Sequence, residues 1–64
     1  MNHLILNKAQ CLFCNDIIES TWVHDFKSCT CGKTSVDGGL EYTRRLYNYL
    51  PSGEKGYKEL SEYE

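Results

Sequence analysis

Two closely spaced cysteine pairs constrain what this 64-residue chain can fold into. Two residues separate Cys11 from Cys14, and one residue separates Cys29 from Cys31. A chain this short buries only a small core, and many domains of this size depend on disulfides, metal ions or oligomerisation. A single metal ion held by all four cysteines would supply the stability that such a core lacks.

The spacing of the cysteines favours a structural zinc site. Zn²⁺ prefers four ligands in a tetrahedron, and two cysteines on one tight turn can both face the ion while backbone amides point at the sulfurs. The fourteen residues between the two pairs are enough for a hairpin that brings the pairs together. The residue after each pair often needs an unusual backbone angle, which suits Gly32 and, next best, Asn15. We therefore expect one Zn²⁺ per chain, with no open position for catalysis, on Cys11, Cys14, Cys29 and Cys31.

Other uses of the cysteines are less favoured. Four unlinked thiols or two disulfides are possible, but the loop from Cys29 to Cys31 is too tight for normal disulfide geometry. An iron site of the rubredoxin kind shares the four-sulfur chemistry, although the second pair is one residue shorter than in that family. His3 and His24 could replace a cysteine ligand, but four cysteines already satisfy the metal.

Charge and hydropathy limit the partners and the location. The formal net charge is −2 with neutral thiols, and a zinc tetrathiolate would bring it to about −4, which argues against indiscriminate binding to nucleic acid. No apolar run approaches the roughly 20 residues that span a bilayer, and the N-terminal stretch does not resemble a signal peptide. We expect a cytoplasmic protein without a membrane segment, where paired cysteines are more often metal ligands or redox thiols than disulfides.

The pattern of apolar and turn-forming residues indicates short strands. The period-two alternation of Trp22, His24 and Phe26 predicts a half-buried strand that forms a hairpin with the preceding strand, turning near Ser20-Thr21. Asp37-Gly38-Gly39 is a strong turn signal. The tyrosines and Thr43 after it favour a strand over a helix. The predicted strands cover residues 3–9, 17–20, 22–28, 34–36 and 40–50.

These elements predict a small, mostly β, zinc-ribbon-like domain in which two cysteine turns clamp one metal. The zinc-stapled domain should cover residues 1–53, and the polar segment 54–64 should be a short extra element or a tail. The candidates for its thin core are Leu4, Leu6, Ile17 or Ile18, Trp22, Phe26, Val36, Leu40, Tyr42 and Leu46.

A second group of residues could form a binding surface. Arg44 and Arg45 are the only adjacent basic pair, and on a strand they point to opposite faces. With basic and aromatic neighbours they could contact phosphates and stack on bases. The favoured alternative is that one arginine pairs with Glu41, Asp37 or Asp25 while the tyrosines pack in the core or contact a protein. The candidate binding residues are Lys33, Tyr42, Arg44, Arg45, Tyr47 and Tyr49.

The order of motifs resembles a group of small bacteriophage and prophage proteins. The resemblance rests on Cys11-x-x-Cys14-x-Asp16-Ile17-Ile18-Glu19-Ser20, on His24-Asp25-Phe26-x-x-Cys29-x-Cys31-Gly32, and on Val36-Asp37-Gly38-Gly39-x-x-Tyr42-x-Arg44-Arg45. It implies a compact zinc-ribbon-type domain encoded by a phage. Phage genomes carry many small proteins that bind and redirect host machinery.

Together these observations predict a non-enzymatic, zinc-stabilised binding module that contacts a host or phage protein in the host-cell cytoplasm. A nucleic-acid-binding zinc ribbon that uses Arg44, Arg45 and stacking tyrosines is the second hypothesis. A rubredoxin-like or thiol-redox protein is the third. A homo-oligomer is plausible, because a thin, tyrosine-rich domain can bury more surface by self-association.

Overall fold

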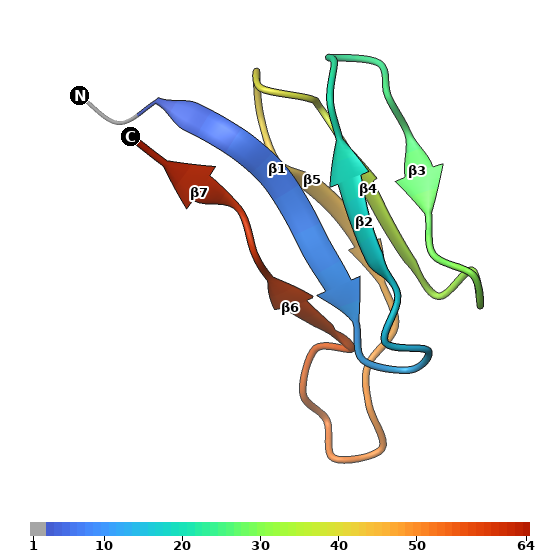
Figure 1. Cartoon of the computed structure of the whole chain (residues 1–64). Helices are drawn as coiled ribbons and strands as arrows, with labels where there is room; N and C mark the ends of the chain where they lie inside the picture. Colours follow the sequence, from blue (N-terminus) through green and yellow to red (C-terminus); the bar gives the residue numbers. More distant parts are fainter. Residues whose placement is uncertain (1–2) are drawn as a thin grey trace.

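Seven short β-strands and no helix make up residues 3–64, the part of the chain that the computed structural model describes (Figure 1). The first two residues of the expected domain, Met1 and Asn2, lie outside this range. The strands are β1 (Leu4–Cys11), β2 (Ile17–Ser20), β3 (Lys27–Ser28), β4 (Thr34–Asp37), β5 (Arg44–Tyr47), β6 (Tyr57–Glu59) and β7 (Glu62–Tyr63). The prediction of a small, mostly β fold is confirmed.

The strands form two antiparallel sheets. In the first sheet β1 is central, with β2 on one edge and β6 and β7 in succession along the other. The second sheet has the order β3-β4-β5. Along β1 the buried residues are Asn7, Ala9 and Cys11, which is the period-two pattern of a strand with one face against a core.

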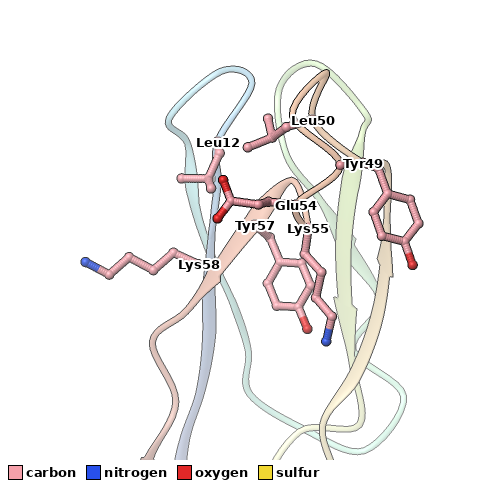
Figure 2. Close-up of a pocket in the computed structure, with 8 residues that line it drawn as sticks. Leu12, Tyr49, Leu50, Glu54, Lys55, Tyr57 and Lys58 are labelled. Carbon is pink, nitrogen blue, oxygen red and sulfur yellow. The ribbon is translucent and has the colours of Figure 1, made fainter.

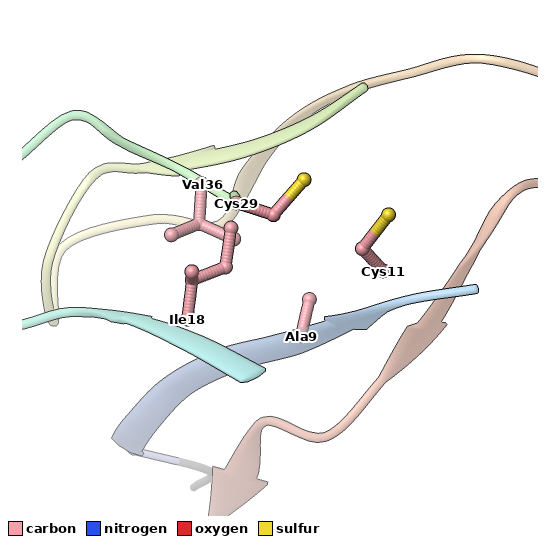
Figure 3. Packing of buried hydrophobic residues seen from close by; sticks show 5 residues of the cluster. All are labelled: Ala9, Cys11, Ile18, Cys29 and Val36. Atoms are coloured by element: carbon pink, nitrogen blue, oxygen red, sulfur yellow. The ribbon is translucent and has the colours of Figure 1, made fainter. Parts of the chain in front are cut away.

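The core between the sheets is small and contains two of the cysteines (Figure 3). Ala9 and Cys11 of β1 and Ile18 of β2 face Val36 of β4 and Cys29. The Sγ atoms of Cys11 and Cys29 point into the space between the two sheets. The fold therefore places part of the candidate metal site inside its own apolar core.

The expected core was largely wrong. Of the residues proposed for it, only Val36 and Ile18 are buried, and Leu4 and Leu6 are partly buried. Polar side chains occupy much of the interior instead; these are Asn7, Ser20, Asp25, Thr34 and Ser35. The large candidates lie at the surface with 43–58% of their area exposed: Ile17, Trp22, Phe26, Leu40, Tyr42 and Leu46.

The predicted strand over residues 22–28 is also wrong, because only Lys27–Ser28 is extended. The Asp25 carboxylate accepts hydrogen bonds from the Thr21 amide (2.9 Å) and hydroxyl (3.0 Å), and the Asp25 amide donates to the Trp22 carbonyl (2.8 Å). Such local side-chain bonds stabilise a turn and compete with a strand. The predicted hairpin is replaced by a crossover, since β2 pairs with β1 while β3 pairs with β4.

The turn predicted at Asp37-Gly38-Gly39 is present, and both glycines have positive φ, 103° and 54°. Asn7 fixes this turn from the other sheet, since its Nδ2 lies 2.8 Å from the Gly39 carbonyl oxygen and also donates to the carbonyls of Asp37 and Tyr42. The Gly39 amide donates to Ser20 Oγ (2.8 Å). These bonds join the loops at the upper end of the molecule in Figure 1.

Residues after the turn follow the predicted strand only in part. Arg44–Tyr47 pair with β4 as β5, whereas residues 40–43 belong to the turn. Residues 48–56 form a hairpin loop with a bridge between Tyr49 and Lys55. The chain then returns along β1 as β6 and β7, so the segment 54–64 supplies two short strands.

Candidate metal centre

Two tight turns at one end of the molecule carry the four cysteines. In the first turn, the Asn15 amide donates to the Cys11 carbonyl (2.8 Å), and Asn15 has a φ of 63°. In the second, the Gly32 amide donates to the Cys29 carbonyl (3.0 Å), and Gly32 has a φ of 76°. The expectation that Asn15 and Gly32 take an unusual backbone angle is confirmed.

The four sulfurs lie close enough together to bind one metal ion. All four Sγ atoms lie within 4.8 Å of one another. Cys31 Sγ is 3.6 Å from Cys11 Sγ and 3.5 Å from Cys29 Sγ. A tetrahedron with Zn–S distances of about 2.3 Å has sulfurs about 3.8 Å apart, whereas a disulfide needs about 2.05 Å. The spacing therefore fits four ligands of one ion, and no histidine belongs to the cluster found in residues 3–64.

Backbone amides point at the sulfurs, as expected for a thiolate site. The Phe13 amide lies 3.4 Å from Cys11 Sγ. Hydrogen bonds from the amides of Cys31 and Asp16 lower the pKa of Cys14. Because each amide carries a partial positive charge, these contacts offset negative charge on the sulfurs.

Two of the sulfurs have pKa values that are shifted in opposite directions. Burial raises the pKa of Cys11, but hydrogen bonds from Thr34, Cys14 and Phe13 outweigh burial and bring the pKa to about 6. The Lys33 amide lowers the pKa of Cys31, but burial and the three neighbouring sulfurs raise it to about 12. The neighbouring sulfurs therefore disfavour a thiolate on Cys31, and a divalent ion would remove that obstacle.

Thr34 supports the cluster and has no signal in the sequence that marks it. The side chain is fully buried, and its Oγ1 has no hydrogen-bond partner within residues 3–64. Thr34 lowers the pKa of Cys11, so its side chain lies near that sulfur. A hydroxyl in this position would donate to a metal-bound thiolate and hold it in place.

Three contacts lock the two cysteine turns to their surroundings. The Asp16 carboxylate of the first turn accepts hydrogen bonds from the Thr30 amide (3.0 Å) and hydroxyl (2.9 Å) in the second. Lys33 Nζ lies 4.5 Å from the centre of the Phe13 ring, again between the two turns. The Leu12 amide donates to the Gly56 carbonyl (2.8 Å), which attaches the hairpin 48–56. Sequence reasoning missed these contacts because they join residues far apart in the chain.

Residues 3–47, well over half of the chain, match a protein family described as a domain of unknown function, DUF7695. The chain belongs to the DUF7695 family. The matched range contains the four cysteines, Thr34, and the Asp16–Thr30 contact. The hairpin 48–56 and strands β6 and β7 lie beyond it. No curated protein and no solved structure matched the chain.

The basic residues predicted for binding do not form one surface on this DUF7695 protein. Arg45 Nε lies 2.8 Å from Glu59 Oε1 and Arg45 Nη2 lies 2.6 Å from Glu59 Oε2, so only 6% of the arginine side chain is exposed. Its acidic partner is not Glu41, Asp37 or Asp25, because the return of the chain along β1 places Glu59 beside β5. Arg44 is exposed, and Lys33 lies over Phe13.

The tyrosines are divided between the two ends of the molecule. Tyr42 packs over Gly38 at the end far from the cysteines. Tyr47 contacts Tyr49 edge-on, with ring centres 5.5 Å apart, and Tyr57 at 4.9 Å. The structure therefore brings Tyr47, Tyr49 and Lys33 to the cysteine end and leaves Tyr42 away from them. In residues 3–64, no helix is long and apolar enough to cross a membrane.

Proposed function

We propose that this DUF7695 protein is a non-enzymatic binding module that is held together by one structural Zn²⁺ and contacts a protein partner. The observation that carries the proposal is the cluster of four sulfurs within 4.8 Å of one another. Four thiolates in a tetrahedral arrangement suit Zn²⁺, and they fill its coordination shell. A filled shell leaves no position for a substrate or an activated water, which favours a structural role.

The small core supports a role for the metal in folding. Five residues make up the buried apolar cluster, and two of them are the ligands Cys11 and Cys29. Only three other residues belong to this cluster, so apolar packing alone contributes little stability. Metal binding would therefore contribute directly to the free energy of folding.

Charge and surface composition support a protein partner. With a zinc tetrathiolate the net charge is about −4, which disfavours a polyanion. The engagement of Arg45 with Glu59 removes one of the basic groups that a nucleic-acid site would use. The resemblance to small phage proteins supports a host or phage protein as the partner and the host-cell cytoplasm as the location.

Metal analysis and unfolding experiments test the metal part of this proposal. We expect one zinc per chain in the purified protein, a colourless solution, and loss of cooperative thermal unfolding after treatment with a strong chelator. Cys14→Ser should have the same effect, and Thr43→Ser, at an exposed position, serves as the matched control. A cooperative transition that persists without metal would refute the structural role, and visible absorption from bound iron would favour the rubredoxin-like alternative.

A further inference from the structure

A groove lies between the first cysteine turn and the hairpin 48–56 (Figure 2). Its volume is about 620 Å³, within the range of sites that bind small molecules or single peptide side chains. Leu12 and Leu50 approach each other from its two sides in Figure 2, and Tyr49 and Tyr57 complete the apolar part of the wall. Except for Leu12, every residue lining the groove lies beyond the segment that matches the DUF7695 family.

Backbone contacts preform the groove. The Leu12 amide donates to the Gly56 carbonyl, and the Gly56 amide donates to the Asn48 carbonyl, both at 2.8 Å. A Cβ on Gly56 would lie only 2.4 Å from the Phe13 ring, so the hairpin and the cysteine turn are in close contact. Because Leu12 lies between Cys11 and Cys14, an ion held by these cysteines would also fix one wall of the groove.

Two basic residues and one acidic residue line the groove, although the whole chain is acidic. Lys55 and Lys58 line it, and neither belongs to an ion pair within residues 3–64. Lys55 lies 5.8 Å from the centre of the Tyr47 ring. The single acidic lining residue, Glu54, accepts a hydrogen bond from Ser52 Oγ (3.2 Å) and places its carboxylate near Leu12 in Figure 2. The ammonium groups of Lys55 and Lys58 extend away from the leucines in the same view. A ligand whose carboxylates lie to the side of its apolar group, over the two lysines, therefore complements this site.

We propose that the groove binds a peptide segment of a partner protein in which an apolar side chain stands next to acidic residues. The apolar side chain occupies the space between Leu12 and Leu50, and the carboxylates contact Lys58 and Lys55. The proposal rests on the proposed function as a binding module and names the surface and the partner chemistry. Leucine walls suit an aliphatic or aromatic side chain better than a stacked base, and the Tyr47 face is covered by Lys55.

Selection of peptides from a random 12-residue display library on the zinc-loaded full chain tests the proposal. We expect enriched peptides in which Asp or Glu lies within two positions of a large apolar residue. Their affinity, measured by isothermal titration calorimetry, should fall at least tenfold with Leu50→Asp and with Lys58→Glu. Replacement of the acidic residue of the peptide by lysine should restore binding to Lys58→Glu, because the charges are then reversed on both sides.

Trp22→Ser is the matched control, since Trp22 is 58% exposed and its backbone lies beside Gly39, in the turn after β4 and not at the groove. Zinc content and far-UV circular dichroism should be unchanged in all three variants. Selected peptides without acidic residues, or peptide binding that survives Leu50→Asp, would overturn the proposal that the groove binds acidic peptides. Loss of peptide binding in the Trp22 variant alone would place the binding surface outside the groove. That result would overturn the groove proposal but not the proposed function as a binding module. A labelled dT12 oligonucleotide whose binding depends on Leu50 would also overturn the peptide proposal.

Discussion

The guanidinium group of Arg45 binds both oxygens of the Glu59 carboxylate, with distances of 2.8 Å from Nε to Oε1 and 2.6 Å from Nη2 to Oε2. This pair joins β5 of one sheet to β6 of the other. Arg45 Nη2 also donates to Ser61 Oγ (3.0 Å), which in turn donates to Glu59. The pair closes the open side of the two-sheet structure near the C-terminal strands.

A double-mutant cycle should detect the contribution of the Arg45–Glu59 pair to stability. We expect Arg45→Met and Glu59→Gln each to lower the free energy of unfolding of the zinc-loaded protein by about 1–2 kcal/mol, with a coupling energy of about 1 kcal/mol. Urea unfolding monitored by tyrosine and tryptophan fluorescence measures all four proteins. A coupling energy within error of zero would mean that the pair does not contribute to holding the sheets together.

The stabilisation from Glu59 should depend on pH. Burial raises the pKa of Glu59. Hydrogen bonds from Arg45 and Ser61 and the positive charge of Arg45 outweigh burial, so the pKa lies below its ordinary value of 4.5. A carboxyl group with a lowered pKa in the folded state stabilises the protein above its ordinary pKa, and this contribution is lost as the pH falls through the folded value.

The difference in unfolding free energy between the wild type and Glu59→Gln should therefore stay constant from neutral pH to about pH 5.5 and shrink below pH 4.5. Both proteins lose thiolate ligands in acid, so the difference isolates the carboxyl group. A difference that grows as the pH falls would contradict the assigned direction of the shift.

Gly39→Ala should be more destabilising than Gly53→Ala. Both glycines have positive φ, which costs about 1–2 kcal/mol for alanine. A Cβ on Gly39 would also lie 2.2 Å from the backbone carbon of Trp22, whereas nothing lies within 4 Å of one on Gly53. We expect losses of about 3 kcal/mol or more and about 1–2 kcal/mol, respectively, in thermal unfolding of the zinc-loaded protein. Equal losses would show that the Trp22 loop moves aside at little cost.

Thr34→Val should weaken zinc binding while preserving the shape of the core. The buried Thr34 hydroxyl has no partner within residues 3–64 and would donate to a metal-bound Cys11 sulfur. Removal of the hydroxyl would take away that donor, and losses of supporting contacts around metal ligands reduce affinity about 10–100-fold. Competition with a chromogenic chelator measures the affinity, and Thr34→Ser, which keeps the hydroxyl, should bind zinc nearly as tightly as the wild type. An unchanged affinity in the valine variant would exclude the hydrogen bond.

The cysteine turns could be predicted from sequence because their geometry is local. Gly32 and Asn15 are residue types that accept positive φ, and both have it. The strand predicted around Trp22 failed because one carboxylate, Asp25, organises a turn through bonds to Thr21, and hydropathy does not register such bonds. The hydrogen bonds of Asp25 therefore determined the local structure, and the alternation of apolar residues did not.

The interior could not be predicted from hydropathy, since polar side chains fill much of it. Asn7 is fully buried and donates to three carbonyl groups of the loop after β4. The partner of Arg45 could not be predicted either, because Glu59 approaches β5 only through the return of the chain along β1. Contacts that depend on how distant strands meet have no signature in the order of residues.

The pairing of β7 with the beginning of β1 sets Tyr63 opposite Leu4. The beginning of β1 and the end of β7 therefore lie at the same end of the first sheet, away from the cysteine turns (Figure 1). A domain with this geometry can be spliced into a surface loop of a carrier protein without stretching either junction. The four cysteines and the groove would then lie at the end of the domain that points away from the carrier protein.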